Sequence, residues 1–208
     1  MSGSEAIASV GTRKRIGIFG GTFDPIHCGH IAVGVLAFEK LDLDEVVFVP
    51  AADPYLRTAP LATITHRCEM VRLATANHPG FTLSMVDANR SGHTYTLDTL
   101  TDLKSELGSE TELVLLLGAD SAVSFDQWKD PAAILELASL AVVSRPGEIN
   151  PATLSENHPA RTAAYIDELG VDISATGIRE NLRDGKSTTD LLPAEVIGYI
   201  RAHGLYSE

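Results

Sequence analysis

The chain has 208 residues, and its 16 lysines and arginines face 28 aspartates and glutamates, which gives a formal net charge of −12. So acidic a chain is a poor candidate for binding nucleic acid or an anionic membrane surface, since both depend on basic side chains. Hydrophobic residues make up 44% of the chain and charged residues 21%. These fractions are near globular averages and exclude a chain that is disordered over its whole length. Two cysteines, Cys28 and Cys68, are too few for a disulfide framework, so we expect a cytoplasmic protein.

Residues 1–14 have no apolar segment of the kind found in signal peptides, and no run approaches the roughly 18–20 apolar residues of a membrane span. We expect residues 1–14 to form a disordered lead-in. Residues 15–208 are expected to form a single domain, because they contain no internal repeat and no low-complexity linker. The last part of this domain, about 174–208, is expected to be small and helical.

Apolar runs of strand length alternate with helical spacing from residue 15 onward. We expect strands at 15–20, 45–50, 81–86, 112–117 and 140–144, with a short extended piece near 164–167. Helices are expected at 29–41, 63–77, 95–107, 131–137, 176–183 and 194–203. The strand 112–117 is apolar on both faces and should therefore be central. The pattern predicts an α/β fold, Rossmann-like and doubly wound, with a mainly parallel sheet and helices on both faces.

The loop after the first predicted strand carries the sequence Gly-Gly-Thr-Phe-Asp-Pro-Ile-His-Cys-Gly-His over residues 20–30. It is neither a P-loop nor a G-x-G-x-x-G fingerprint. Its adjacent glycines let backbone N–H groups approach an anion, and the helix that follows points its positive N-terminus at the same place. His27 and His30, three residues apart at the helix start, can donate on the same side. The loop therefore predicts a phosphate site.

Two other interpretations of His27 and His30 are considered. Each histidine alone is more often a hydrogen-bonded polar residue at a helix cap. The pair could also hold zinc, but only Asp24 or Cys28 is at hand as a third ligand, which disfavours a zinc site. The whole eleven-residue combination is hard to explain as packing, so the phosphate site is favoured.

Further motifs follow in a fixed order along the chain. The segment Ile-Ser-Ala-Thr-Gly-Ile-Arg occupies residues 173–179, and between it and the first motif lie Tyr-Thr-Leu-Asp-Thr-Leu at 95–100, Gly-Ala-Asp-Ser at 118–121, Trp128, and Ser-Arg-Pro-Gly at 144–147. With H-x-G-H, this ordered set resembles the H-x-G-H nucleotidyltransferases and, within them, the bacterial nicotinate-nucleotide adenylyltransferase family. The resemblance spans about residues 15–206.

The resemblance implies adenylyl transfer from ATP to nicotinate mononucleotide, giving deamido-NAD and pyrophosphate in NAD biosynthesis. The expected partners are therefore ATP and nicotinate mononucleotide, with no nucleic acid and no membrane; a homo-oligomer is left open. It also implies Mg²⁺ bridging the ATP phosphates, for which we assign no protein ligand. Because the attacking phosphate is already ionised at pH 7, the reaction needs positioning and charge neutralisation rather than a strong base.

The resemblance also assigns roles to residues. His27, His30 and Arg179 are the expected catalytic residues, with Arg179 on the departing pyrophosphate. The expected ATP-binding residues are Gly20, Gly21, Thr22, Phe23, His27, His30, Asp120, Arg145, Ser174 and Arg179. Taken alone, Arg179 would more often be a solvent-facing helix charge, and Asp120 is as well suited to capping the next helix as to holding a ribose hydroxyl.

For the acceptor, the resemblance implies stacking on Trp128 and contacts from amides around Thr96, Leu97 and Lys129. The Lys129 charge would favour an acid over an amide substrate. The segment 51–57 departs from the family's Pro-Pro-His-Lys/Arg loop and keeps only a proline and Arg57, which could meet a substrate phosphate. Nicotinamide mononucleotide, another phosphorylated acceptor, and a non-catalytic nucleotide-binding module therefore stay as alternatives.

Overall fold

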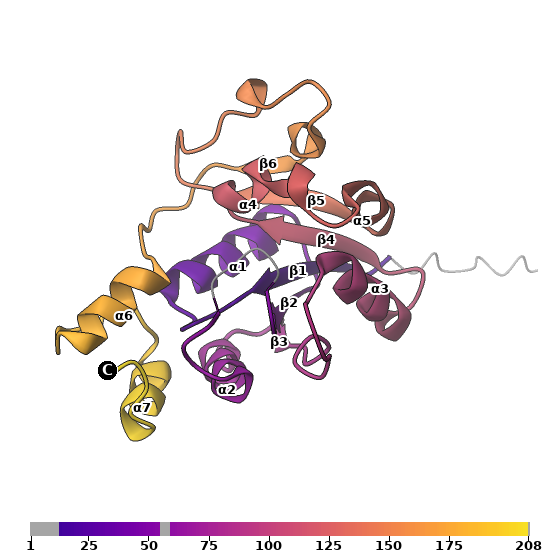
Figure 1. Cartoon of the computed structure of the whole chain (residues 1–208). Helices are drawn as coiled ribbons and strands as arrows, with labels where there is room; N and C mark the ends of the chain where they lie inside the picture. The colour runs from indigo at the N-terminus through magenta and orange to yellow at the C-terminus, as the bar shows by residue number, and fades with distance from the viewer. Residues whose placement is uncertain (1–12, 55–58, 208) are drawn as a thin grey trace, which may run out of the picture.

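The computed structural model describes residues 13–54 and 59–207. Six strands form one sheet in the order β3-β2-β1-β4-β5-β6, and every neighbouring pair is parallel (Figure 1). The strands are β1 (Arg15–Gly21), β2 (Glu45–Pro50), β3 (Phe81–Leu83), β4 (Glu112–Leu117), β5 (Ala138–Val143) and β6 (Ala164–Ile166). The predicted α/β class and the central place of β4 are confirmed. Of the predicted lead-in 1–14, only Arg13 and Lys14 are described.

Seven α-helices accompany the strands in the described residues: α1 (Cys28–Lys40), α2 (Ile64–Thr75), α3 (Thr96–Leu107), α4 (Ala119–Val123), α5 (Pro131–Leu137), α6 (Ala175–Arg183) and α7 (Ala194–Ala202). Three short 3₁₀ turns, η1 (Phe125–Gln127), η2 (Pro151–Thr153) and η3 (Pro159–Thr162), lie in the connections. The sequence did not predict α4, whose five residues are too few to show a helical period. The predicted strand 81–86 is also longer than the observed β3 (Phe81–Leu83). β3 is an edge strand with β2 as its only strand neighbour.

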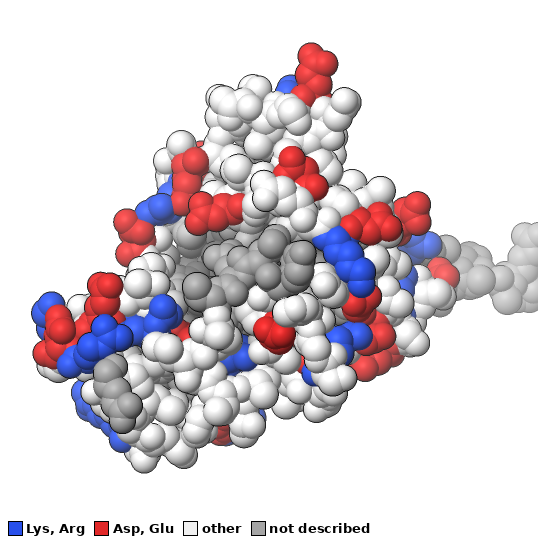
Figure 2. Space-filling view, viewed as in Figure 1, with Lys and Arg blue, Asp and Glu red and all other residues white. Residues whose placement is uncertain are grey.

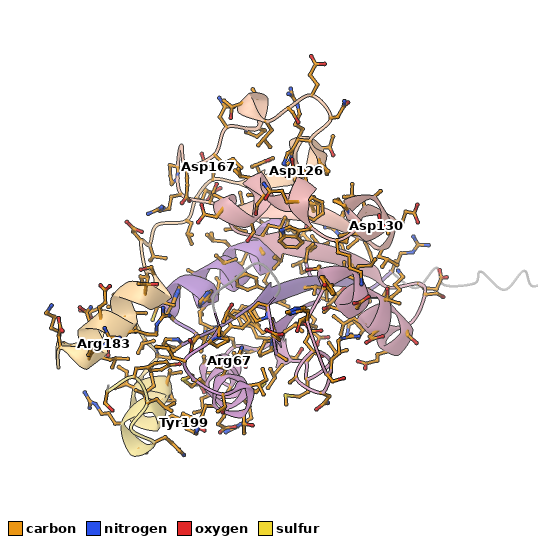
Figure 3. The ribbon with its side chains drawn as sticks, viewed as in Figure 1. Arg67, Asp126, Asp130, Asp167, Arg183 and Tyr199 are labelled. Carbon is orange, nitrogen blue, oxygen red and sulfur yellow. The ribbon has the colours of Figure 1, made fainter. Side chains whose placement is uncertain are left out.

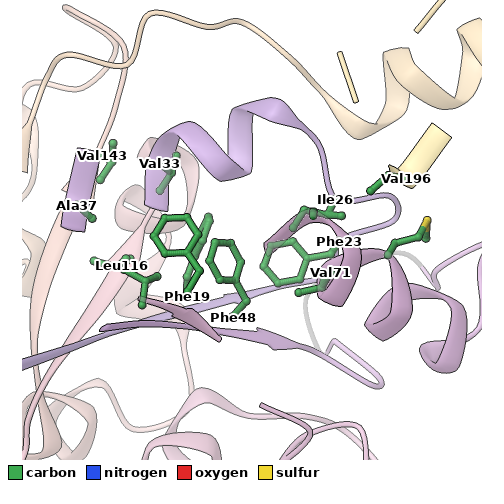
Figure 4. Packing of buried hydrophobic residues seen from close by; sticks show 14 of the residues in the cluster. Phe19, Phe23, Ile26, Val33, Ala37, Phe48, Val71, Leu116, Val143 and Val196 are labelled. Atoms are coloured by element: carbon green, nitrogen blue, oxygen red, sulfur yellow. The ribbon is translucent and has the colours of Figure 1, made fainter. Parts of the chain in front are cut away.

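Alternate residues along each strand face opposite sides of the sheet, and each side packs against its own helices. Phe19, Phe48 and Leu116 belong to the core that contains residues from α1, α2, α6 and α7. Figure 4 shows Phe19 and Phe48 between the sheet and α1, with Phe23 beside them. The other face packs against α3, α4 and α5, with Leu115 and Leu100 among its members. The sheet is therefore covered on both faces, as predicted.

The strand order reverses between β1 and β4, which are hydrogen-bonded neighbours although β2 and β3 separate them in the chain. The helix after β1 covers one face, and the helix after β4 covers the other. In doubly wound sheets, ligands bind at the carboxyl ends of the strands where the order reverses. The loops after β1 and β4 are thus the first place to look for a site.

The C-terminal helices pack onto the same core as the sheet. Ile178 of α6 and Val196 and Ile200 of α7 are buried in the cluster that contains Phe19. Helix α7 lies against α2, where the hydroxyl of Tyr199 is 2.9 Å from the ring Nδ1 of His66. The division of the chain into a lead-in and one domain stays a prediction. Across the described part of the chain, every helix is too short or too polar to cross a bilayer.

Candidate functional site

Residues 22–27, here called the β1 loop, join the end of β1 to the start of α1. Gly21 cannot carry a side chain without displacement, because a Cβ there would lie 2.9 Å from the Phe23 ring. Phe23 itself has φ near +49°, a conformation that costs a non-glycine residue free energy. Its ring is 2% exposed and packs edge-on against Phe19 and His30. The Phe23 side chain is thus part of the core, and only its backbone remains for a ligand.

His27 and His30 stack at the start of α1, with ring centroids 3.7 Å apart. Gly29 makes this possible, since a Cβ at that position would lie 3.0 Å from Nδ1 of His27. The backbone N–H of His27 donates to Nδ1 of His30 at 3.2 Å, so a neutral His30 carries its proton on Nε2 and can donate from there. The sequence prediction that both histidines share one side of the helix start is confirmed.

Both imidazoles are held neutral at pH 7. Burial lowers the pKa of His27 to about 4, and burial together with the neighbouring His27 lowers the pKa of His30 well below its usual range. Nδ1 of His27 is buried and has no hydrogen-bond partner among the described residues. His27 is also the N-cap residue of α1, and the ring of His30 accepts from its backbone N–H, so the two residues do serve the helix cap. The cap does not use the proton on Nε2 of His30, and this leaves a donor for an anion beside the capping role.

Helix α6 brings the second motif to the β1 loop. Ser174 caps this helix, its hydroxyl accepting from the N–H of Gly177 at 3.2 Å. Arg179, one turn on, donates from Nη1 to the backbone oxygen of Asp24 at 2.8 Å and from Nη2 to the hydroxyl of Thr176 at 3.2 Å. The contact joins residues 155 positions apart in the chain. Arg179 therefore lies against the β1 loop rather than pointing freely into solvent.

Asp120 and Arg145 follow the next two strands of the sheet. Asp120 lies in the first turn of α4, but Gly118 is the capping residue, so the interpretation of Asp120 as a helix cap is wrong. Arg145 comes just after β5, and its guanidinium pairs with Glu148 at 2.6 Å and with Asp172. The hydrogen bond to Glu148 raises the pKa of Arg145. Its charge is thus already matched by two carboxylates.

The residues expected to recognise the acceptor gather around the start of α3. Thr96 and Leu97 form its first turn. Nζ of Lys129 lies 4.2 Å above the centre of the Tyr95 ring and 3.4 Å from a carboxylate oxygen of Asp98. The preceding residue, Trp128, packs against Phe125 with ring centroids 5.2 Å apart. Arg57, the expected contact to the acceptor phosphate, lies outside the described residues.

Arg67, to which the sequence analysis gave no role, and Asp24, which it considered only as a possible zinc ligand, hold the β1 loop in place together with Tyr206. Arg67 of α2 is 1% exposed and donates to carbonyls of the loop and its neighbours. Asp24 is 5% exposed, and its carboxylate accepts from the hydroxyl of Tyr206 at 2.7 Å. One signal was present, because Arg67 interrupts the apolar stripe formed by Ile64, Cys68 and Val71 on α2. Nothing in the sequence links Tyr206 to Asp24.

On the face shown in Figure 2, Lys and Arg side chains are interspersed with Asp and Glu side chains around the rim. Several Lys and Arg side chains of the described residues form ion pairs with Asp or Glu, such as Arg145 with Glu148. The buried histidines at the start of α1 therefore differ from these paired surface charges.

The chain matches the family described as cytidylyltransferase-like over residues 18–181. A "Probable nicotinate-nucleotide adenylyltransferase" from Hydrogenovibrio crunogenus is 40% identical over 207 residues, covering 94% of this chain and 99% of the relative. A protein with the same description from Thermomicrobium roseum is 41% identical over 197 residues, covering 93% of this chain and 92% of the relative.

Solved structures show the same fold. The Plasmodium falciparum nicotinic acid mononucleotide adenylyltransferase complexed with NaAD superposes with a TM-score of 0.73 at 20% identity, covering 93% of this chain and 97% of that one. The same protein complexed with APC gives a TM-score of 0.73 at 22% identity, with the same coverage.

Proposed function

This chain belongs to the cytidylyltransferase-like family and, within it, to the nicotinate-nucleotide adenylyltransferases. We propose that it transfers the adenylyl group of ATP to nicotinate mononucleotide. An oxygen of the acceptor 5′-phosphate attacks the α-phosphorus of ATP, the new P–O bond forms, and the bond to the β-phosphate breaks. The products are deamido-NAD and pyrophosphate, so the reaction serves NAD biosynthesis.

The observation that carries this proposal is the desolvated histidine pair at the start of α1. His27 and His30 are neutral near pH 7 and lie at the end of β1, where the sheet order reverses. Neutral N–H donors suit a reaction that builds charge on phosphate oxygens and needs no strong base. An approaching polyphosphate would raise the pKa of both imidazoles and strengthen their hydrogen bonds.

The remaining ATP contacts are proposed from position. Arg179 lies within reach of the β1 loop, and its forked donors suit the departing pyrophosphate. Ser174 and the start of α6 would add donors to the triphosphate. Backbone groups of Gly20, Gly21, Thr22 and Phe23 would face the nucleotide, Asp120 would hold a ribose hydroxyl, and Arg145 would line the adenine or phosphate side.

The acceptor would bind at the start of α3. Trp128 would stack on its pyridine ring, and amides at Thr96, Leu97 and Lys129 would receive its carboxylate. Lys129 adds a positive charge, although its ion pair with Asp98 already offsets part of that charge. Arg57 is retained as a proposed contact to the acceptor phosphate. The cytoplasmic location and any homo-oligomer likewise stay predictions.

The N–H donors at the β1 loop suit phosphate oxygens and not a cation, so Mg²⁺ would have to arrive bound to the nucleotide. Among the described residues, no three His, Cys, Asp or Glu side chains come together as a metal cage. The carboxylate of Asp24 is already occupied by the N–H groups of Leu61 and Ala62 and by Tyr206. Mg²⁺ commonly keeps its waters and binds through substrate phosphates. Bound in this way, it would neutralise charge on the pyrophosphate, while the protein orients the phosphates.

The test is pyrophosphate release from ATP and Mg²⁺ with each acceptor supplied separately. We expect release with nicotinate mononucleotide at a higher kcat/KM than with nicotinamide mononucleotide. Faster release with the amide would replace the proposed acceptor. ATP binding by calorimetry without turnover on either acceptor would instead support a non-catalytic nucleotide-binding module.

A further inference from the structure

Arg67 is the largest fully buried side chain among the described residues, and it projects from α2 toward the sheet (Figure 3). Its guanidinium donates from Nη1 to the oxygens of Thr22 and Ala51, both at 2.7 Å. It also donates from Nη2 to Ala52 at 3.1 Å and from Nε to Ala62 at 3.2 Å. All these acceptors are backbone carbonyls, so the charge is held by dipoles rather than by a directly bonded carboxylate.

The four carbonyls belong to three separate segments of the chain. Thr22 lies in the β1 loop, Ala51 and Ala52 directly follow β2, and Ala62 precedes α2. The rigid fork of one guanidinium therefore fixes these segments relative to one another. Such burial is costly, because desolvation lowers the pKa of Arg67 and disfavours its charged form. An apolar side chain would avoid that cost but would leave the four carbonyls without their donor.

Asp24 also joins the β1 loop to the segment before α2 and to α6. Its carboxylate accepts from the N–H of Leu61 at 2.7 Å and of Ala62 at 3.0 Å, while its own backbone oxygen accepts from Arg179. The carboxylate also attracts the guanidinium of Arg67. The β1 loop, the segment before α2 and α6 therefore meet at one buried pair of opposite charges.

From Arg67 the connection continues to the start of α3. The N–H of Asp53 donates to the hydroxyl of Thr94 at 3.2 Å, and the N–H of Thr94 donates back to the oxygen of Asp53 at 2.9 Å. Pro54 and Thr94 form a parallel bridge. Thr94 lies two residues before Thr96, where α3 begins. Arg67 is thus connected to the proposed acceptor site by its hydrogen bonds to Ala51 and Ala52, by the backbone that continues to Asp53, and by the hydrogen bonds between Asp53 and Thr94.

We propose that Arg67 is a positioning residue: it sets the distance between the β1 loop and the start of α3, and hence between the two substrates. The proposal rests on the function proposed above. In-line attack needs the reacting atoms about 3–3.5 Å apart, and a misplacement of about 1 Å can cost on the order of 100-fold in rate. Arg67 touches neither substrate, and its effect passes through residues 51–54 and Thr94.

The main test compares Arg67→Lys with wild type. Lysine keeps the positive charge but cannot reach four carbonyls with one ammonium group. We expect kcat to fall by roughly 100-fold while KM for ATP changes less than about 3-fold, because the fork that aligns the substrates is lost. Amide hydrogen exchange should also speed up at Ala51 and Thr94, which are remote from the substituted side chain along the chain. Arg72→Lys on the same helix is the matched control, since Arg72 is exposed and pairs with Glu69.

A purely structural role would lower the melting temperature but leave kcat per folded molecule within about 2-fold of wild type, and that result would overturn the proposal. If Arg67→Lys does not fold, Thr94→Val decides, since it removes the acceptor for Asp53 at the far end of the connection. It should lower kcat several-fold at unchanged melting temperature, and an unchanged kcat would overturn the proposal. Absence of pyrophosphate release by wild type with every acceptor would contradict the proposed function instead, and exchange at Ala51 would still report on Arg67.

Discussion

The two ends of the proposed site are built by different means. At the β1 loop and the start of α1, Asp24 and His27 are about 95% buried; the His27 ring stacks on His30, and the Asp24 carboxylate accepts from backbone N–H groups and from Tyr206. At the start of α3, Lys129 and Asp98 form a pair whose side chains are 47% and 35% exposed. The first arrangement derives its properties from desolvation, and the second from surface charges that water screens.

Substitutions at the two ends should therefore affect different steps of the reaction. Buried neutral donors change the energy of the transition state, since they are aimed at developing charge in a site that excludes water. Exposed pairs can be rearranged at little cost and contribute under about 1 kcal/mol each. We therefore expect substitutions at the start of α1 to lower kcat, and substitutions at the start of α3 to change acceptor affinity and selectivity.

The largest effect is expected at the histidine pair. His30→Ala removes one donor aimed at phosphate oxygens, and such a loss typically costs on the order of 100- to 1000-fold in kcat. Pyrophosphate release under saturating ATP measures it. Cys28→Ala, inside the same motif, is the control and should keep most of its activity. Full activity of His30→Ala would refute the assignment of this end as the catalytic one.

Two buried groups, His27 at the start of α1 and Asp87 packed against α3, should respond to acid in opposite directions. His27 has a pKa of about 4 when folded and 6.5 as its reference, so the unfolded chain binds more protons between these values. The free energy of unfolding should therefore fall by about 2 kcal/mol from pH 7 to pH 5 on account of His27. His30 acts in the same direction, because its pKa is also lowered.

Asp87 near α3 opposes this trend. Its carboxylate is 3% exposed and accepts from the hydroxyl of Thr99, and burial raises its pKa from 3.8 to about 6. The folded state therefore binds the extra proton, and stability should rise by about 1 kcal/mol from pH 7 to pH 5. Urea unfolding of Asp87→Asn should show greater loss of stability in acid than wild type, and His27→Gln should show less. Identical pH dependence in all three proteins would contradict both assignments.

Trp128 tests the recognition end. Trp128→Ala removes the proposed stacking surface, and stacking of a ring on an aromatic side chain is worth about 1–3 kcal/mol. We expect KM for the acceptor to rise roughly 10-fold, with a smaller change in kcat. Trp128→Phe retains a ring and should recover most of the affinity. A normal acceptor KM in Trp128→Ala would mean that Trp128 serves only to pack on Phe125.

The sequence could predict what depends on local spacing. The H-x-G-H spacing predicted the shared face of His27 and His30, and the small residue between them is needed because a Cβ at Gly29 would approach the His27 ring. The alternation of apolar runs predicted the sheet and its central strand β4. These features arise from neighbours within a few residues, which periodicity records directly.

Contacts between distant segments could not be predicted in this way. The Arg179 contact with Asp24 spans 155 positions, and the Tyr206 contact with Asp24 spans 182. Both depend on how α6 and the segment after α7 pack against the sheet. The neutral state of His27 also depends on burial, which a motif does not report. Arg67 was an intermediate case, because a charge within an apolar stripe was visible but its four acceptors were not.

The smallest effect is expected at Lys129. Its charge would favour a carboxylate on the acceptor, but Asp98 already offsets part of it and water screens the rest. Lys129→Ala should therefore narrow the ratio of kcat/KM between nicotinate and nicotinamide mononucleotide by only about 2- to 3-fold. Lys40→Ala is the control, since Lys40 is a comparably exposed lysine that pairs with Glu168 outside the proposed site. If the ratio is unchanged in Lys129→Ala, backbone amides alone select the acid. If this ratio of kcat/KM falls by about 100-fold, Lys129 at the start of α3 must be as desolvated as the histidine pair when substrate is bound. The contrast between the two ends would then hold only for the free protein.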